Sequence, residues 1–241
     1  MKISIDESQR KALRAAGLLY LLVAITAPIG LMYVPSTLIV TGDATATADN
    51  IRASESLLRI GIGSELFHQT VAVFLVLALY RLFKAVNEQH AKLMVILGAL
   101  VSVPIMFLNV LNEIAALILV SGADFLSAFE KSQLDALALL FLRLHDQGIN
   151  VASIFWGLWL FPFGILVTRS GFIPRLLGVL LFIAGSGYLV SSFTSILLPQ
   201  YANLVGQIAL VLGVGELPII FWLFIRGLRP SGITEPQKVI G

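Results

Sequence analysis

Cysteine is absent from the 241-residue sequence, and this absence removes several kinds of chemistry. Disulfide bonds, thiolate nucleophiles, iron–sulfur clusters and cysteine-ligated zinc sites are all excluded. A metal ion would therefore need histidine and carboxylate ligands. The sequence also lacks a Ser-His-Asp order, a glycine loop that cradles phosphate, and the H-E-x-x-H zinc motif. Catalytic residues are therefore unknown at this stage, and whether the protein is an enzyme stays open.

Charged residues are scarce as well. They make up 12% of the sequence, against 58% hydrophobic residues, whereas soluble domains carry roughly 25% charged residues. So few charges cannot cover a surface that faces water, so the expected partner of most of the surface is the lipid bilayer. Basic residues do not gather in a patch interleaved with aromatic residues, and we therefore expect no nucleic-acid partner.

The sequence does contain a series of apolar runs, each close to the roughly 20 residues that a helix needs to cross the hydrocarbon core. Helices are expected because a span must satisfy its backbone polar groups internally. We predict an all-α fold: an integral membrane bundle of six transmembrane helices, forming a single domain over residues 1–241. The predicted spans are 14–34, 57–80, 93–120, 149–168, 176–198 and 204–225.

The distribution of lysine and arginine predicts the orientation of this bundle. Of the 16 basic residues, all but Arg52, Arg59, Lys131 and Arg143 fall at the ends or in the loops that would share one side of the membrane. Because basic residues favour the cytoplasmic side, we expect both termini in the cytoplasm of a cell whose inner (plasma) membrane holds the protein. The residues that support this side are Lys2, Arg10, Lys11, Arg14, Arg81, Lys84, Lys92, Arg169, Arg175, Arg226, Arg229 and Lys238.

The segment around the fourth span is too long for one crossing. A helix over 133–168 would extend about 54 Å at 1.5 Å per residue, so either its first part projects outward or it bends near Gly148. Ser132 and Asp135 match a capping pattern that predicts a helix start at this point.

A second helix is expected between the first and second spans. In the segment 41–56, Asp43 or Thr45 is expected to cap a helix that could continue into the second span.

Polar residues that are costly in lipid recur within or beside these spans, at spacings that place them on one face of each helix. Counting 1.5 Å per residue from the cytoplasmic end puts Glu65 at about 24 Å, His145 near the outer boundary at about 35 Å, and Glu216 deeper at about 15 Å. The pattern predicts a pocket in the outer half of the bilayer, with Glu216 as its floor. The candidate residues are Glu65, His68, Asn109, Asn112, Glu113, His145, Asp146, Asn150 and Glu216.

Three interpretations of this polar set remain open. The first is the binding or transport of a small polar or cationic solute. The second is a membrane-embedded, metal-dependent enzyme, because Glu65-x-x-His68 has the i, i+3 form of di-iron bundles, with Glu113 as a further metal ligand. A second Glu-x-x-His is missing, so we expect no metal and no cofactor. The third is a structural or accessory protein whose polar groups join helices. A second copy of the chain is a further candidate partner.

Several stretches resemble one bacterial family of multi-pass membrane proteins, catalogued as domain of unknown function 4386. The resemblance covers about Arg10 to Gly227, and it implies an integral membrane protein without an established activity. It also implies that His145 and Glu216 are regular features, whereas Glu65 and His68 are more variable. The stretches that carry the resemblance are AAGLLYLL (15–22), GDATATADNI (42–51), ALLFLRLH (138–145), RSGFIPRLLG (169–178) and Gly215-Glu216.

Overall fold

The computed structural model describes residues 7–228, and all regular structure in that range is helical. Three of the basic residues used to predict orientation, Lys2, Arg229 and Lys238, lie outside it. The elements, in chain order, are α1 (Glu7–Pro28), the π-helical segment η1 (Ile29–Tyr33), α2 (Val34–Leu38), α3 (Ala44–Ala53), α4 (Glu55–Phe83), α5 (Glu88–Val95), the π-helical segment η2 (Ile96–Val101), α6 (Ser102–Val120), the 3-10 turn η3 (Asp124–Leu126), α7 (Lys131–Arg169), α8 (Arg175–Leu197), the 3-10 turn η4 (Pro199–Tyr201), α9 (Ala202–Gly213), the 3-10 turn η5 (Val214–Glu216) and α10 (Leu217–Leu228).

Six helical segments in the described range are long and apolar enough to cross a membrane, which confirms the predicted fold class. Three of them join consecutive elements of different helix type, and the other three are single α-helices. The depth at which each enters the hydrocarbon stays a prediction. The segments are Gln9–Leu38, Glu55–Phe83, Glu88–Val120, Lys131–Arg169, Arg175–Leu197 and Pro199–Leu228.

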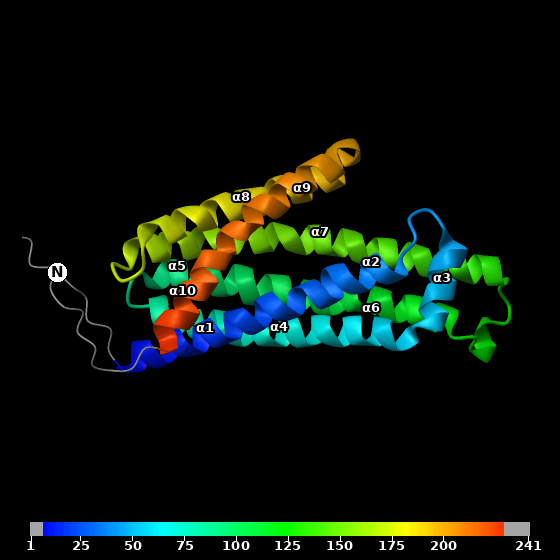
Figure 1. Cartoon of the computed structure of the whole chain (residues 1–241), viewed down its shortest axis with the longest axis horizontal. Helices are drawn as coiled ribbons and strands as arrows, with labels where there is room; N and C mark the ends of the chain where they lie inside the picture. The colour runs from blue at the N-terminus through cyan, green and yellow to red at the C-terminus, as the bar shows by residue number, and fades with distance from the viewer. Residues whose placement is uncertain (1–6, 229–241) are drawn as a thin grey trace, which may run out of the picture.

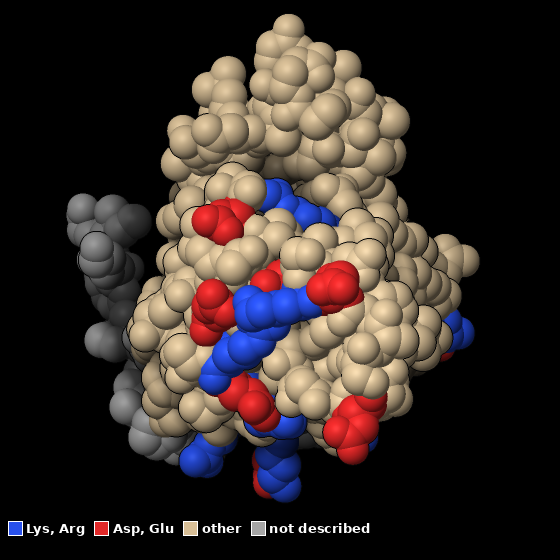
Figure 2. Space-filling model, turned by 90° about the vertical axis from the view of Figure 1, so that its right-hand side faces the viewer, with Lys and Arg blue, Asp and Glu red and all other residues tan. Residues whose placement is uncertain are grey.

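The helices form an elongated bundle (Figure 1). Helices α1, α4, α6 and α7 run side by side, α8 lies along α7, and α9 with α10 returns over α8 and α1. The start of α1, the end of α10 and the loops 84–87 and 170–174 all lie at one end. The opposite end carries α3 and η3, and there acidic and basic side chains are interleaved (Figure 2).

Helix α7 runs without a break over 39 residues, or about 58 Å. The bend considered near Gly148 is therefore absent, and the first turns project beyond the other helices toward the α3 end. Ser132, the residue predicted to cap the start of this helix, is not its N-cap residue. Glu130 is the N-cap residue and forms a reciprocal capping box with Gln133. Asp135 instead lies in the first turns of the helix and is buried, because it binds basic side chains.

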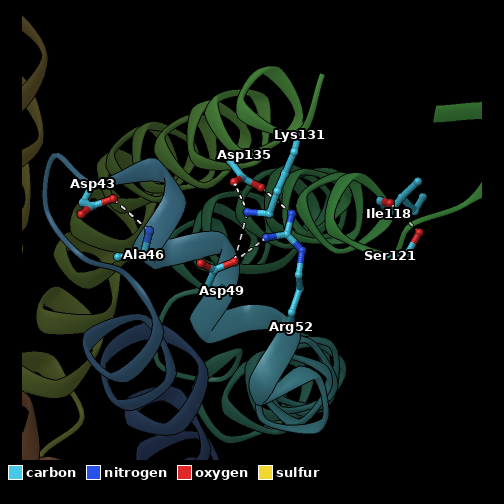
Figure 3. Close-up of polar contacts among 8 residues, drawn as sticks. All are labelled: Asp43, Ala46, Asp49, Arg52, Ile118, Ser121, Lys131 and Asp135. Carbon is cyan, nitrogen blue, oxygen red and sulfur yellow. Dashed lines mark hydrogen bonds and ion pairs between the residues drawn. The ribbon is translucent and has the colours of Figure 1, made fainter. Parts of the chain in front are cut away.

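Helix α3 covers this end of the bundle and is clamped to α7 by four charged residues (Figure 3). Arg52 binds both Asp135 and Asp49, and Lys131 lies 2.8 Å from Asp135 and 3.2 Å from Asp49. Hydrogen bonds from Lys131 and Arg52 lower the pKa of Asp49. This carboxylate therefore adds stability above the ordinary aspartate pKa of about 3.9, and that contribution is lost as the pH falls through the lowered folded-state pKa.

The predicted cap of α3 is confirmed at Asp43, whose carboxylate accepts a hydrogen bond from the amide of Ala46 at 2.9 Å. The helix does not continue into the second span. It ends at Ser54, and α4 begins at Glu55 in a new direction.

Glycines let α7 and α8 approach until their backbones touch. A Cβ at Gly185 would lie 2.9 Å from the carbonyl oxygen of Gly157, and one at Gly178 would lie 2.8 Å from the carbonyl oxygen of Gly164. Small residues favour such contacts in membranes, where dispersion and close packing replace the hydrophobic effect between helices. The seven-residue spacing of Gly178 and Gly185 on α8 is the sequence signal of this seam.

We predict that Gly185→Ala destabilises the protein by about 1–3 kcal/mol, because an added methyl forces two backbones apart. Gly63→Ala is the matched control, since a Cβ at this exposed position of α4 meets no atom within 4 Å. The control should leave stability equal or slightly higher, because alanine is the better helix former. Thermal unfolding of both variants in detergent measures the difference, and equal melting temperatures would contradict the close approach.

We predict that Arg52→Ala lowers stability by about 1–3 kcal/mol, because the buried Asp135 loses one of its two partners. Arg59→Ala removes an exposed i, i+4 pair with Glu55, whose side chains are 62% and 50% exposed. That change should cost less than about 0.5 kcal/mol. Detergent unfolding compares the variants, and an Arg59 effect as large as the Arg52 effect would contradict the clamp.

Candidate functional site

Two carboxylates and one imidazole meet in the centre of the bundle. Glu65 comes from α4, Glu113 from α6 and His145 from α7, and each residue is only 2% exposed. Nε2 of His145 lies 3.1 Å from Oε2 of Glu65 and 3.8 Å from Oε2 of Glu113. One candidate ligand atom from each residue lies within 4.8 Å of the other two. Three helices thus contribute one ionisable group each to a single buried cluster.

A hydrogen bond between α6 and α7 sets the position of His145. The side-chain amide of Asn109 donates to the backbone carbonyl of His145 at 2.9 Å, and Asn112 donates to Oδ1 of Asn109 at 3.1 Å. A Cβ at Gly148 would overlap the amide of Asn109, so only glycine permits this approach. Two of the predicted residues, Asn109 and Asn112, therefore hold the cluster together.

The π-helical segment η1 covers Glu65. Gly30 is buried there, and a Cβ at this position would lie 2.6 Å from Cγ of Glu65. Pro28 ends α1 immediately before the segment and has no N–H to donate to the carbonyl four residues earlier, which favours a change of helix type at this point. π-helical turns are frequent at functional sites, and here one brings backbone against a buried acid.

Part of the cluster lacks hydrogen-bond partners within the described residues. Oε1 of Glu65 and Oε2 of Glu113 are both buried and have none. A cavity of about 10 Å³ lies beside Glu113 and His145, and the half-buried Asp146 also lines it. Buried polar atoms are almost always satisfied in folded proteins, so these two oxygens mark the cluster as a place for an additional group.

A second site surrounds Glu216. The hydroxyl of Tyr20 donates to Oε2 of Glu216 at 2.8 Å, and Tyr188 interacts with the same carboxylate. These residues line a cavity of about 260 Å³ together with Trp156 and Trp159. The ring of Tyr20 lies 6.2 Å from that of Trp159, and the ring of Trp156 lies 6.5 Å from that of Tyr188. One acid thus faces a cavity with four aromatic side chains in its wall.

The helix type changes in the sixth apolar segment where that segment supplies Glu216. Helix α9 ends at Gly213, η5 forms a 3-10 turn, and α10 begins at Leu217. Pro218 cannot donate a backbone hydrogen bond across the turn. A Cβ at Gly17 of α1 would lie 2.6 Å from the backbone of Phe224, so α1 and α10 touch, and Tyr20 follows one turn after that contact.

The predicted candidates therefore do not share one cavity. Glu65, Asn109, Asn112, Glu113, His145 and Asp146 belong to the first site or adjoin it. His68 and Glu216 line the second cavity, and Nδ1 of His68 lies 3.2 Å from the carbonyl oxygen of Val23 rather than joining the metal-ligand candidates. Asn150 lines a third cavity of about 420 Å³, which shares Pro28, Tyr188, Gly213 and Leu217 with the second.

Sequence reasoning missed part of the second site. It did not include Tyr20, Tyr188, Trp156 or Trp159, because aromatic side chains in an apolar span are ordinarily core or lipid contacts. Gln69 was not among the candidate residues, although its spacing of four residues from Glu65 places it on the same face of α4. Its buried Nε2 has no hydrogen-bond partner among residues 7–228, and the residue lines the cavity of Glu216.

Comparison with known proteins agrees with the resemblance found in the sequence. An archaeal relative from Archaeoglobus fulgidus, an uncharacterized protein, is 32% identical over 98 residues. That match covers 39% of this chain and 57% of the relative. No solved structure matches the chain. The family described as "Domain of unknown function (DUF4386)" matches residues 15–227, and the chain therefore belongs to this family.

Proposed function

We propose that the protein binds a small organic cation in the Glu216 cavity and carries it across the membrane. The observation that carries this proposal is the cavity of about 260 Å³ with one carboxylate and four aromatic side chains in its wall. Acids within membrane segments are costly and commonly mark sites for ions or substrates. Mostly apolar walls with a few directed polar groups are typical of small-molecule sites.

The composition of the wall favours a cation of ammonium type. Glu216 supplies the opposite charge, and Tyr20 orients its carboxylate through a 2.8 Å hydrogen bond. Tryptophan and tyrosine faces attract cations, with energies of about 2 kcal/mol when the cation is desolvated. An anion would be repelled by an ionised Glu216, and a purely apolar solute would supply no opposite charge to it.

The change of helix type at Glu216 supports transport over static binding. Transporter sites are commonly built where membrane helices are discontinuous, and Glu216 lies in the 3-10 turn between α9 and α10. The third cavity, which shares four wall residues with the second, adds Asn150 and Ser153 as polar groups on a route toward Glu216. A hinge at η5 would let α10 move while Tyr188 stays on α8.

Binding is tested by tryptophan fluorescence with tetraethylammonium as probe. In a Trp222→Phe background, the signal comes from the two remaining tryptophans, Trp156 and Trp159. We expect saturable quenching, weakened about 10- to 100-fold by Glu216→Gln, because the substitution removes the opposite charge from a site of low effective dielectric constant. Glu88→Gln is the matched control, because the Glu88 side chain is exposed and pairs with the exposed Lys92.

Transport is tested with the same variants in proteoliposomes. Uptake of labelled tetraethylammonium should exceed that of protein-free vesicles, fall in Glu216→Gln and persist in Glu88→Gln. If the ion binds saturably but is not taken up, the protein is a cation-binding protein and the proposal of transport is wrong. An absence of both, in protein that unfolds cooperatively, would contradict the proposal for tetraalkylammonium ions.

We also propose that both termini face the cytoplasm of a cell whose inner (plasma) membrane holds the protein, because basic residues favour that side. The absence of cysteine makes this directly testable, since one introduced cysteine is the only reactive thiol. In intact cells a membrane-impermeant maleimide should label Ser127→Cys, after η3, and not Lys84→Cys, at the basic end. Both positions are exposed, so the reagent can reach each of them from its own side of the membrane. Labelling of Lys84→Cys and not of Ser127→Cys would show the opposite orientation.

A further inference from the structure

We infer that Glu65, Glu113 and His145 form a binding site for one divalent transition-metal ion. This site differs from the Glu216 cavity in every residue, so it stands or fails independently of the cation proposal. The inference rests on the geometry of the three side chains, on their two unpartnered oxygens, and on the charge that they gather in an apolar environment.

The donor atoms are spaced almost as closely as those around a bound metal ion. Metal–ligand distances of about 2.1 Å for nitrogen and oxygen ligands allow donor atoms to be at most about 4.2 Å apart. The candidate donor atoms lie within 4.8 Å of one another, and Nε2 of His145 is already 3.1 Å from Glu65 and 3.8 Å from Glu113. Small rotations about side-chain bonds therefore bring all three onto one ion.

Two close contacts fix the surroundings of the donors. Asn109 holds the carbonyl of His145, and Gly148 makes room for that amide. Gly30 packs against the side chain of Glu65. Ligands that are held in place by surrounding contacts bind metal with less loss of conformational freedom.

Charge balance also points to a cation. Within residues 7–228, the ion-pair partner of both Glu65 and Glu113 is His145, and neither pairs with lysine or arginine. Even a protonated imidazole leaves two carboxylates with one compensating charge in a buried site. Oε1 of Glu65 and Oε2 of Glu113 have no hydrogen-bond donor. A divalent ion would neutralise both acids and occupy their free lone pairs.

The donor set selects the class of ion. One imidazole nitrogen with two carboxylate oxygens suits Zn²⁺, Fe²⁺ or Mn²⁺, whereas Ca²⁺ requires six to eight oxygen ligands and Cu⁺ prefers sulfur. Three protein ligands leave a further coordination position open, as in catalytic zinc sites. The cavity of about 10 Å³ beside Glu113, His145 and Asp146 is about the size needed for one water molecule.

The experiment uses the full-length protein, purified in detergent without chelator. Elemental analysis should find a transition metal at about one ion per chain. After chelation, Co²⁺ should restore one ion per chain with visible ligand-field absorption, and Zn²⁺ or Mn²⁺ should compete. Since ligand at about 100 times its Kd adds about 2.7 kcal/mol, the melting temperature of this chain should rise by about 5–10 °C.

Variants separate the metal site from a structural cluster. His145→Ala and Glu113→Gln should lower Co²⁺ affinity about 100-fold or more, because each removes or weakens a direct ligand. His90→Ala is the matched control, since His90 lies at the start of α5 and contacts Asn87. It should bind Co²⁺ like the wild type.

The wild-type measurements decide the inference even where a variant fails to fold. Protein that unfolds cooperatively, carries no transition metal as purified, and shows neither absorption nor a melting shift with Co²⁺, Zn²⁺ or Mn²⁺ would overturn it. The three residues would then share a proton instead of a metal. Equal loss of Co²⁺ binding in His90→Ala would also overturn it, because the ion would then be bound elsewhere.

Discussion

The contact of His145 with Glu65 and Glu113 is the constraint on which much of the bundle depends. Three ionisable groups that are each 2% exposed cannot be rehydrated in a membrane, so they must satisfy one another or hold a cation. This requirement fixes α4, α6 and α7 at one relative height and rotation. Dispersion between apolar side chains alone would allow one helix to slide past another by one turn. The same slide would leave a buried carboxylate without a partner, and its energetic cost prevents the movement.

Glycines and changes of helix type allow the polar groups to meet. In η1, Gly30 brings backbone onto Glu65, and in η2, Gly98 would place a Cβ 3.1 Å from the indole ring of Trp159. Pro28 and Pro104 lie next to these two segments, and each lacks the N–H that a regular α-helix would use. Both π-helical segments thus place a glycine against a residue of one of the two sites.

The sequence predicted what depends on local pattern. Apolar runs of sufficient length identified six membrane helices, and i, i+3, i+4 spacing placed Glu65, His68 and Gln69 on neighbouring positions of one face. Hydropathy cannot report how a helix is rotated toward a particular neighbour. The structure turns Glu65 toward His145 and His68 toward Val23, so one predicted face serves two different sites.

Depth was the second quantity that the sequence could not supply. Counting from the cytoplasmic loops separated Glu65 and His145 by about 11 Å, yet their side chains touch. The count treats every helix as straight and perpendicular to the membrane. Helix α7 is a long continuous helix, α6 is preceded by a π-helical segment, and the helices of the bundle are tilted (Figure 1). Small differences in rise and tilt, added over five turns, are enough to move a residue by that distance.

The two sites are also linked through α1 and α4. Glu65 belongs to the buried acidic cluster, and Gln69, one turn later, lines the cavity of Glu216. On the facing helix Pro28 lines that same cavity, while Gly30 packs against Glu65. A movement of α1 about η1 would therefore change both sites at once. Because packed interiors shift between discrete arrangements rather than deforming smoothly, a ligand at either site would bias the position of the same helix.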